Sequence, residues 1–278
     1  MPTKLYVVNA FTAHSKHGNP AGVVLGAEAM DEKKMLAMAA EVDLSETAFV
    51  SSSDTAAYRV RFFTPTVEVP LCGHATIATW SLLHQLGQVT TGTHMQETNA
   101  GLLQVTIRDD GLTFMEQAEA TFFETIAPTD IAPLLGIPVD TFHAGLSPRI
   151  VSTGIRDLLV PVNNTSVLGT LQPDLEAIAA FSRQHDISGF HVFAMDGSSQ
   201  SLASARNFAP ADGIPEESAT GTSNGALLCY LKHEGVLPER DVYRIEQGEA
   251  MGQLSYVYGT FKGGRVWVGG EATVIEEY

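Results

Sequence analysis

The sequence contains one pattern twice, at a spacing of about 148 residues. In the first copy, residues 61–65 (RFFTP) precede Gly73 and a segment over residues 75–86 that is mostly apolar on every side. In the second copy, residues 206–210 (RNFAP) precede Gly221 and another nearly all-apolar run. A helix that is apolar all round has no side for solvent, so each segment predicts a helix in the interior of a domain. The spacing is too long for a solenoid and predicts two similar domains, each built around one buried helix.

Strand patterns surround the buried helix in both copies. A second, outer helix is predicted at residues 31–42 in the first copy and at residues 174–184 in the second. This order predicts an α+β fold in which each domain is a curved mixed β-sheet or barrel wrapped around its central helix. We place the N-terminal domain at residues 1–117 plus 264–278 and the C-terminal domain at residues 118–263. No low-complexity linker separates the halves, so we expect them to meet along a cleft.

The composition excludes several classes of protein. With 278 residues, 44% hydrophobic and 17% charged, the chain is typical of a globular protein. A net charge of −16 argues against a nucleic-acid partner, although local donors can still bind a small anionic substrate. The two cysteines are too few for a secreted disulfide scaffold. Neither a signal-peptide pattern nor an apolar run of about 18 residues is present, so we expect a cytoplasmic protein outside the membrane.

Two glycines, Gly73 and Gly221, stand at the predicted starts of the buried helices. Glycine there lets backbone N–H groups approach a ligand, and a helix N-terminus favours negative charge, so the pair predicts a site for a substrate carboxylate. The alternative is that each glycine only makes the tight turn into the helix. His74, next to Gly73, is a candidate proton donor or ligand contact, or else a capping histidine.

Two carboxylates are candidates for acid/base chemistry. Glu46 lies among apolar residues, in LSETAFV at residues 44–50, where a carboxylate can act as a general acid or base. The commoner role of such a glutamate is an exposed charge at the start of a strand. Glu217 precedes the second buried helix, and the counterpart region of the first copy holds Glu68. A carboxylate there can simply stabilise the helix dipole.

The first cysteine, Cys72, stands at the start of the first buried helix, where a thiol can act as a nucleophile or base. Its alternative role is that of a buried structural cysteine. Its repeat partner is Thr220, so an arrangement with two thiols, as in some racemases, is not available. No metal site is predicted, because no second His or Cys stands at metal-ligand spacing around His74, and His14 and His17 lack acidic or Cys companions.

Several short motifs make the sequence resemble the phenazine-biosynthesis PhzF family, within the diaminopimelate-epimerase-like fold. The most specific are LSETAFV and the Gly73-His74 helix start. The others, in the family's order, are residues 9–11 (NAF), 18–20 (GNP), 63–65 (FTP), 68–70 (EVP) and 216–225 (EESATGTSNG). The resemblance implies two domains of similar topology, a cleft between them, a homodimer and no cofactor.

The resemblance also implies roles for single residues. In the family, the glutamate that matches Glu46 is the catalytic acid/base. The residues that match Gly73-His74 and Gly221-Thr222 line the substrate pocket. The family reaction is the isomerisation of trans-2,3-dihydro-3-hydroxyanthranilate, in which the glutamate takes a proton from one ring carbon and returns it to another on the same face.

The sequence therefore predicts a cofactor-independent isomerase that acts on a small carboxylic acid. Glu46 is expected to move the proton, and His74, Glu217 and Thr222 to position or protonate the substrate. Family members often have aspartate at position 217 and serine at position 222, and these differences can change which substrate fits. Two alternatives stay open. One is a racemase or epimerase of a small amino or hydroxy acid with Glu46 and Cys72 as opposed bases, and the other is a non-catalytic protein that binds a metabolite or a partner.

Overall fold

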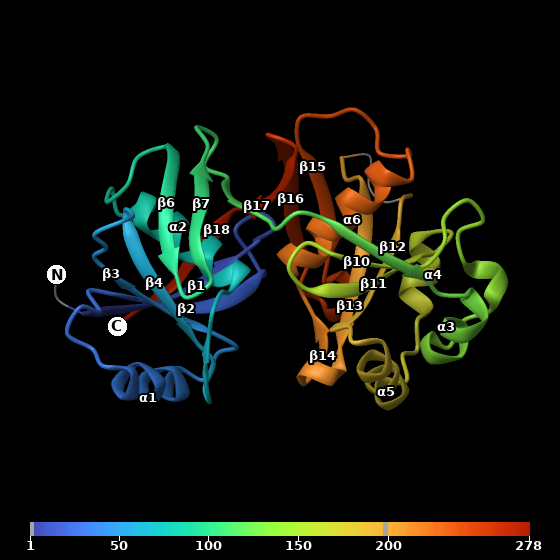
Figure 1. Ribbon diagram of the computed structural model, residues 1–278, viewed down its shortest axis with the longest axis horizontal. Coiled ribbons are helices and arrows are strands. Elements are labelled where there is room, and N and C mark those ends of the chain that lie inside the picture. Colours follow the sequence, from blue (N-terminus) through green and yellow to red (C-terminus); the bar gives the residue numbers. More distant parts are fainter. Residues whose placement is uncertain (1–2, 197–199) are drawn as a thin grey trace. The chain divides into compact units, whose positions relative to one another are not determined.

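The computed structural model describes residues 3–196 and 200–278 and divides the chain into two compact units (Figure 1). The first unit comprises Met1–Glu116 together with Gly269–Tyr278, and the second comprises Gln117–Val268. The first unit therefore contains both ends of the chain, whereas the second is one uninterrupted stretch.

The first unit is a mixed sheet with the strand order β18-β1-β2-β3-β4-β6-β7-β8, in which the short β5 pairs with β4. The β2–β3 and β4–β6 pairs are parallel, and the other pairs are antiparallel. Helix α1 (Glu32–Val42) connects β2 to β3, and α2 (Gly73–Gln85) connects β4 to β6. The strands are β1 (Lys4–Ala10), β2 (Asn19–Leu25), β3 (Thr47–Ser51), β4 (Tyr58–Phe63), β5 (Glu68–Val69), β6 (Gly92–Thr98), β7 (Gly101–Ile107), β8 (Thr113–Glu116) and β18 (Ala272–Glu277).

The second unit repeats this arrangement. Its strands follow the order β9-β10-β11-β12-β13-β15-β16, with β14 on β13, and the β11–β12 and β13–β15 pairs are parallel. Helices α5 (Leu175–His185) and α6 (Gly221–His233) connect these parallel pairs, as α1 and α2 do in the first unit. The remaining elements are β9 (Thr121–Thr125), β10 (Arg149–Ser152), β11 (Arg156–Pro161), β12 (Gly189–Ala194), β13 (Ala203–Ala209), β14 (Ile214–Glu217), β15 (Tyr243–Gln247), β16 (Ser255–Lys262), β17 (Arg265–Gly270), α3 (Pro128–Leu135), α4 (Thr165–Thr170) and the 3₁₀ turns η1 (Val139–Thr141), η2 (Pro210–Asp212) and η3 (Glu249–Met251).

The central helix of each unit is buried on all sides. In α2 every residue from 74 to 83 is buried, and in α6 so are Gly221 and residues 223–231. Helix α2 contacts strands from both ends of its sheet, β18 and β8, as well as β1 and β2, so the sheet curves around it. Removing so many apolar side chains from water is the main favourable contribution to the stability of each unit.

The two largest fully buried side chains lie on these central helices, and their polar atoms have partners. Trp80 on α2 donates its indole N–H to Gln96 Oε1, and Tyr230 on α6 donates its hydroxyl to Ser147 O at 2.8 Å. An unsatisfied polar atom in such a position would cost about 1–3 kcal/mol. Trp80 and Tyr230 therefore fill the interior while their own buried donors are paired.

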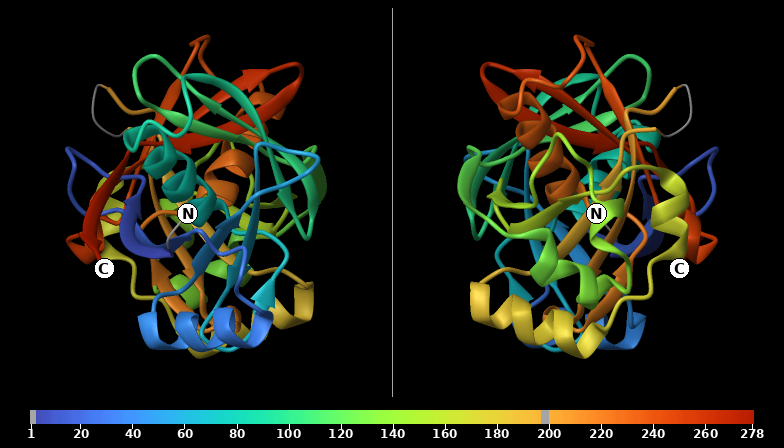
Figure 2. Two further views of the ribbon diagram at one scale, coloured as in Figure 1. Left: turned by 90° about the vertical axis from the view of Figure 1, so that its left-hand side faces the viewer. Right: turned by 90° about the vertical axis from the view of Figure 1, so that its right-hand side faces the viewer.

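The outer helices α1 and α5 lie outside the strands of their own units, as the two end views in Figure 2 show. Each has 11 residues and buries only one side. Each also begins at an aspartate whose side chain accepts a backbone hydrogen bond, Asp31 from Lys34 N and Asp174 from Ala177 N. Such an N-cap stabilises a helix by about 1 kcal/mol, so these aspartates define where the outer helices start.

A bidentate Arg–Glu ion pair recurs at the same place in both units. Arg61 on β4 donates to Glu68 at 2.6 and 2.7 Å, and Arg206 on β13 donates twice to Glu216 at 2.8 Å. The Arg61 guanidinium keeps the pKa of Glu68 below its usual range. Glu68 was expected to correspond to the region of Glu217. The residue that corresponds to Glu68 is Glu216, one position earlier, because Glu216 makes the equivalent ion pair. Glu217 therefore does not take part in this ion pair.

The predicted fold class is confirmed, since both units have the same topology and each is a curved mixed sheet around a central helix. The central helices begin at the predicted glycines, Gly73 and Gly221. Across residues 3–196 and 200–278, none of the helices combines the length and apolar character that crossing a membrane requires.

Candidate active site

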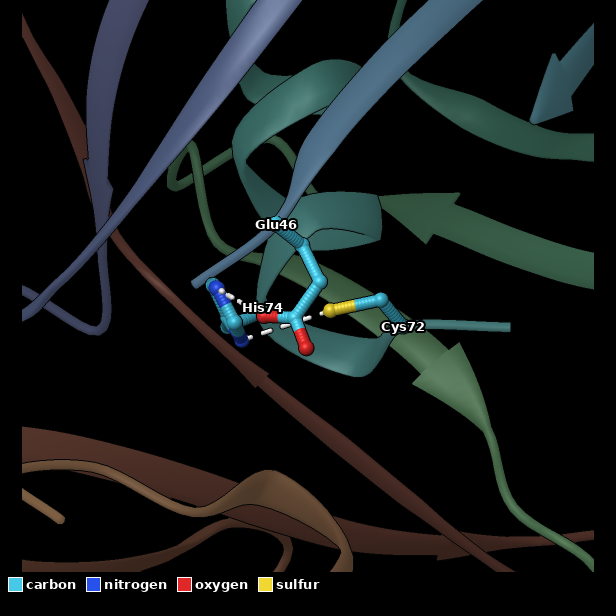
Figure 3. Close-up of side chains that lie close together, drawn as sticks. All are labelled: Glu46, Cys72 and His74. Atoms are coloured by element: carbon cyan, nitrogen blue, oxygen red, sulfur yellow. Dashed lines mark hydrogen bonds and ion pairs between the residues drawn. The ribbon is translucent and has the colours of Figure 1, made fainter. Parts of the chain in front are cut away.

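Three side chains of the first unit lie together at the N-terminus of α2 (Figure 3). Cys72 is the residue before the helix, His74 is its second residue, and Glu46 directly precedes β3. Glu46 Oε2 lies 3.4 Å from His74 Nε2, and Cys72 Sγ lies 3.4 Å from Nδ1 of the same ring. The imidazole thus joins a carboxylate on one side to a thiol on the other.

The pairing of β2 with β3 positions Glu46. The backbone N–H of Gly22 on β2 donates to Glu46 O at 3.1 Å, and β3 then continues in parallel register with β2. A Cβ at Gly22 would lie 2.7 Å from Thr47 Oγ1, so the two strands can approach this closely only because Gly22 has no side chain. The Glu46 side chain is 22% exposed, so it is partly buried but accessible to a small molecule.

His74 is almost fully buried, with 8% of its surface exposed. Burial lowers the pKa of His74, and the Glu46 carboxylate and a hydrogen bond to the Pro20 backbone oppose this shift. The ring is therefore neutral at pH 7, with one nitrogen that donates and one that accepts. Ser45 Oγ also lies 3.4 Å from Nε2. A neutral imidazole in this position can orient Glu46 and Cys72 or pass a proton between them.

No side chain caps the N-terminus of α2 or of α6, and the same holds for α3. Asp31, Asn164 and Asp174 cap α1, α4 and α5, whereas Cys72 and Thr220 make no capping hydrogen bond through their side chains. Neither α2 nor α6 has an acidic residue in its first turn. The positive ends of both helix dipoles therefore suit an anionic ligand group.

The predicted residues of the second unit gather at the start of α6. Gly221 is the first helical residue, Thr222 is the second and is half-buried, and Glu217 ends β14. Glu217 Oε2 accepts a hydrogen bond from Thr220 Oγ1 at 2.5 Å, and Thr153 Oγ1 donates to Thr222 O at 3.0 Å. These residues form one group within their unit, as Glu46, Cys72 and His74 do within theirs.

A buried polar network beside the start of α6 was not predicted from the sequence. Asn224 Oδ1 lies 3.2 Å from His191 Nε2, and the Asn224 amide nitrogen donates to Thr220 O at 2.9 Å and to Gln247 Oε1 at 2.7 Å. Gln247 Nε2 in turn donates to Glu217 O at 2.8 Å. The network therefore holds the backbone on which the candidate residue Glu217 stands.

The buried ring of His191 is neutral in this network. Burial lowers the pKa of His191 to about 4, so the ring carries a single N–H at pH 7. Because the Asn224 nitrogen donates to other groups, its oxygen faces Nε2 of the ring, and Asn207 Oδ1 lies 3.1 Å from Nδ1, so each ring nitrogen has an amide oxygen as its neighbour. The sequence signal for this network is the polar pair Ser223-Asn224 inside an otherwise apolar helix, since buried polar side chains need partners.

A second buried ionisable residue of this unit, Asp157 on β11, was also missed. It is 2% exposed and accepts a hydrogen bond from Ser223 Oγ at 2.6 Å. Burial raises the pKa of Asp157 to about 6, and the hydrogen bond from Ser223 partly opposes the shift. Asp157 thus ties β11 to the first turn of α6 and gains its charge within the range of ordinary pH.

Replacing Asp157 by Asn is expected to make folding stability less sensitive to pH. In the unfolded chain the carboxyl ionises near 3.8, whereas in the folded protein it keeps its proton to about 6. The stability of the native protein therefore falls as pH rises through this window, and the variant lacks this fall. The unfolding free energy of the variant relative to the native protein should rise by roughly 2 kcal/mol between pH 4 and pH 7. Urea unfolding at both pH values measures this change, and a constant difference would contradict the assignment.

The side chains of Glu46, Cys72 and His74 are close enough together to be possible ligands of one metal ion. One possible ligand atom from each residue lies within 4.8 Å of the other two. No companion for His74 was expected from the sequence, whereas the structure places Cys72 and Glu46 beside it. The sequence pattern does not indicate this cluster, because Cys72 is only two positions from His74 and Glu46 comes from a different element.

The comparison with known proteins gives a consistent result. The chain matches the PhzC-PhzF family, described as "Phenazine biosynthesis-like protein", over residues 8–277. It is 36% identical over 262 residues to the uncharacterized isomerase YddE of Escherichia coli (strain K12), which covers 91% of this chain and 88% of that protein. It is also 34% identical over 265 residues to an uncharacterized isomerase of Clostridium acetobutylicum, with coverage of 91% and 88%.

The solved structures agree with this result. A PhzF-family phenazine biosynthesis protein of Bacillus anthracis has a TM-score of 0.89 at 27% identity, over 100% of this chain and 99% of that one. A hydroxyproline epimerase from Agrobacterium vitis shares the fold, with a TM-score of 0.62 at 15% identity over 99% and 91% of the two chains. The predicted family and the prediction of an isomerase are confirmed by these matches. The family match covers residues 8–277 and so includes both units, which shows that the chain belongs to the phenazine biosynthesis-like (PhzC-PhzF) family.

Proposed function

We propose that this family member is a cofactor-independent isomerase that moves a proton within a small carboxylic acid, with Glu46 as the acid/base. The observation that carries the proposal is the position of Glu46 Oε2, 3.4 Å from the ring of His74 at the uncapped N-terminus of α2. The carboxylate is partly exposed, so a substrate can reach it. The helix start beside it provides backbone donors for an anionic substrate group.

The reaction needs a single base that acts twice. The Glu46 carboxylate removes a proton from one carbon, and the electron pair of that C–H bond shifts through the adjacent double bonds to a second carbon. Protonated Glu46 then gives the proton to the second carbon on the same face, so no oxidant or reductant is required. Neutral His74, whose Nε2 lies 3.4 Å from the carboxylate, would keep it oriented through both steps. The proposed substrate is an unsaturated or cyclic carboxylic acid of the trans-2,3-dihydro-3-hydroxyanthranilate type.

The proposed role of the second unit is to bind the same substrate. Thr222 and Glu217 would position it, and the amides at Gly221 would help to hold its carboxylate. Support comes from the repeat, because α6 starts at a glycine and lacks a side-chain cap, as α2 does. A cytoplasmic homodimer, as the family resemblance implies, is part of the proposal, and light scattering on the purified protein tests the oligomeric state.

A specific observation also supports a second candidate, a racemase or epimerase of a small amino or hydroxy acid. Cys72 Sγ lies 3.4 Å from His74 Nδ1, so a thiol and a carboxylate flank one imidazole and offer two acid/base groups. Inverting a stereocentre usually needs a base on each face, and Cys72 would be the second. Activity that survives in Cys72→Ala would contradict this candidate.

Proton exchange in D₂O distinguishes the two candidates. The protein is incubated with dihydro-hydroxyanthranilate and with a panel of small amino and hydroxy acids, and deuterium uptake is followed by NMR. Rearrangement of the diene acid is the expected result. Exchange at the α-carbon of an amino acid would replace the proposal by the epimerase, and a ligand that binds tightly without any exchange would indicate a binding protein.

A further inference from the structure

The cluster of Glu46, Cys72 and His74 combines the three kinds of side chain that bind zinc in proteins, namely carboxylate, thiolate and imidazole. The thiolate matters most for selectivity, because soft sulfur ligands favour Zn²⁺ and similar transition ions over Mg²⁺ or Ca²⁺. We propose that this cluster reversibly binds a thiophilic divalent cation such as Zn²⁺, and that the bound ion inhibits the enzyme.

Two ligand atoms of the cluster, one from His74 and one from a neighbouring side chain, already have the separation that a tetrahedral ion requires. Metal–ligand bonds of about 2.0–2.3 Å at tetrahedral angles separate neighbouring ligand atoms by about 3.3–3.7 Å. The separations Glu46 Oε2 to His74 Nε2 and Cys72 Sγ to His74 Nδ1 are both 3.4 Å. An ion uses only one ring nitrogen, so the third ligand must approach from within the 4.8 Å span of the cluster. The partly exposed Glu46 side chain can do this by rotating about its own bonds.

The other two ligands are held in place by their surroundings. Cys72 is 9% exposed and His74 8%, and the His74 ring also hydrogen-bonds to the Pro20 backbone. Metal-bound histidines usually have such a second partner, which fixes the orientation of the ring. Cys72 is held in place as the residue that directly precedes α2.

Three protein ligands leave the fourth position of a tetrahedral ion open to water or to a substrate carboxylate. An ion bound to Glu46 occupies the lone pair that would accept the substrate's proton, so it blocks the reaction. This inhibition rests on the proposed function of Glu46, whereas binding of the ion does not.

Cobalt absorption tests the binding directly, without any substrate. Co²⁺ is titrated into the purified, reduced protein, and a thiolate-to-cobalt charge-transfer band together with the visible bands of tetrahedral Co²⁺ is expected at one ion per chain. Zn²⁺ should abolish both sets of bands by displacing Co²⁺. Cys72→Ala should lose the charge-transfer band and weaken Co²⁺ affinity by at least about 100-fold. His74→Gln, which keeps the thiol, should weaken it similarly.

The second cysteine supplies the matched control. Cys229 is buried in α6, and burial raises its pKa to about 11, so it stays a protonated thiol. Cys229→Ala should therefore keep both the charge-transfer band and the affinity. A band that persists in Cys72→Ala, is lost in Cys229→Ala, or never forms in the native protein would overturn the metal site. Zn²⁺ binding without loss of turnover would refute only the inhibition, and an inactive protein that still binds Co²⁺ would refute the proposed function alone.

Discussion

Glu46→Gln is expected to lower kcat by at least about 10³-fold and to leave folding and ligand binding intact. Glutamine has nearly the same size and keeps an oxygen near His74 Nε2, so the local packing is preserved. It cannot accept the substrate's proton, and a positioned general base contributes about 10²–10⁴-fold to a rate. The rate of deuterium incorporation measures the loss, while urea unfolding and ligand titration show that the variant is folded and binds.

The matched control for this prediction is Glu41→Gln. Glu41 is an exposed residue of α1, and its replacement removes the same negative charge from the same unit. Its kcat should stay within about twofold of the native value, because exposed charges far from the reacting atoms have small effects. Full activity in Glu46→Gln would reject Glu46 as the acid/base. Equal losses in both variants would assign the effect to net charge.

The central and outer helices could be predicted because their signals are local. Apolar residues on every side of the middle of α2 and of α6 exclude a surface helix, whatever the rest of the chain does. Asp31 and Asp174 mark the starts of α1 and α5 as N-caps. Since both kinds of signal occur twice in the same order, the common topology of the two units followed from the repeat.

Strand β9 and helix α4 are among the elements that were not predicted, because β9 forms by pairing with a distant strand and α4 is short. Strand β9 is largely exposed and does not alternate, and it becomes a strand by pairing with β10, where Thr125 lies opposite Arg149. Helix α4 has six residues and begins at the cap Asn164, so it is too short for a periodic pattern to appear. Pairing across such separations leaves no mark in a short window of sequence.

The candidate site was predictable as a set of residues but not as a geometry. Motifs singled out Glu46 and His74, yet their 3.4 Å separation arises from the pairing of β2 with β3 and from the packing of α2 inside its sheet. His191 could not be recognised because it is one polar residue within an otherwise apolar strand, and Asp157 because it stands beside Arg156 at the start of β11, where charged residues are common. Only their partners, Asn224 and Ser223, show that these polar side chains belong to the start of α6.

Asn224→Leu is expected to destabilise the protein by about 3–5 kcal/mol. Leucine fills a similar volume but removes three hydrogen bonds, to His191, Thr220 and Gln247. Thr220 O and Gln247 Oε1 each keep a backbone N–H donor, from residue 224 and from Thr220. The neutral ring of His191 keeps Asn207 Oδ1 as a neighbour of Nδ1, so the expected loss is that of three buried hydrogen bonds in one network. Urea unfolding at pH 7 measures the loss.

Asn163→Ala is the matched control for the network. Asn163 is an exposed asparagine of the same unit whose amide donates to Asp140 O at 3.0 Å, so its loss should cost less than about 1 kcal/mol. If Asn224→Leu costs no more than this control, the network does not stabilise the second unit. The hydrogen bond between His191 and Asn224 is lost in each single variant but only once in the double variant Asn224→Leu/His191→Leu, so the double variant should be more stable than the sum of the two single losses predicts. Strictly additive losses would show that His191 and Asn224 do not act as one network.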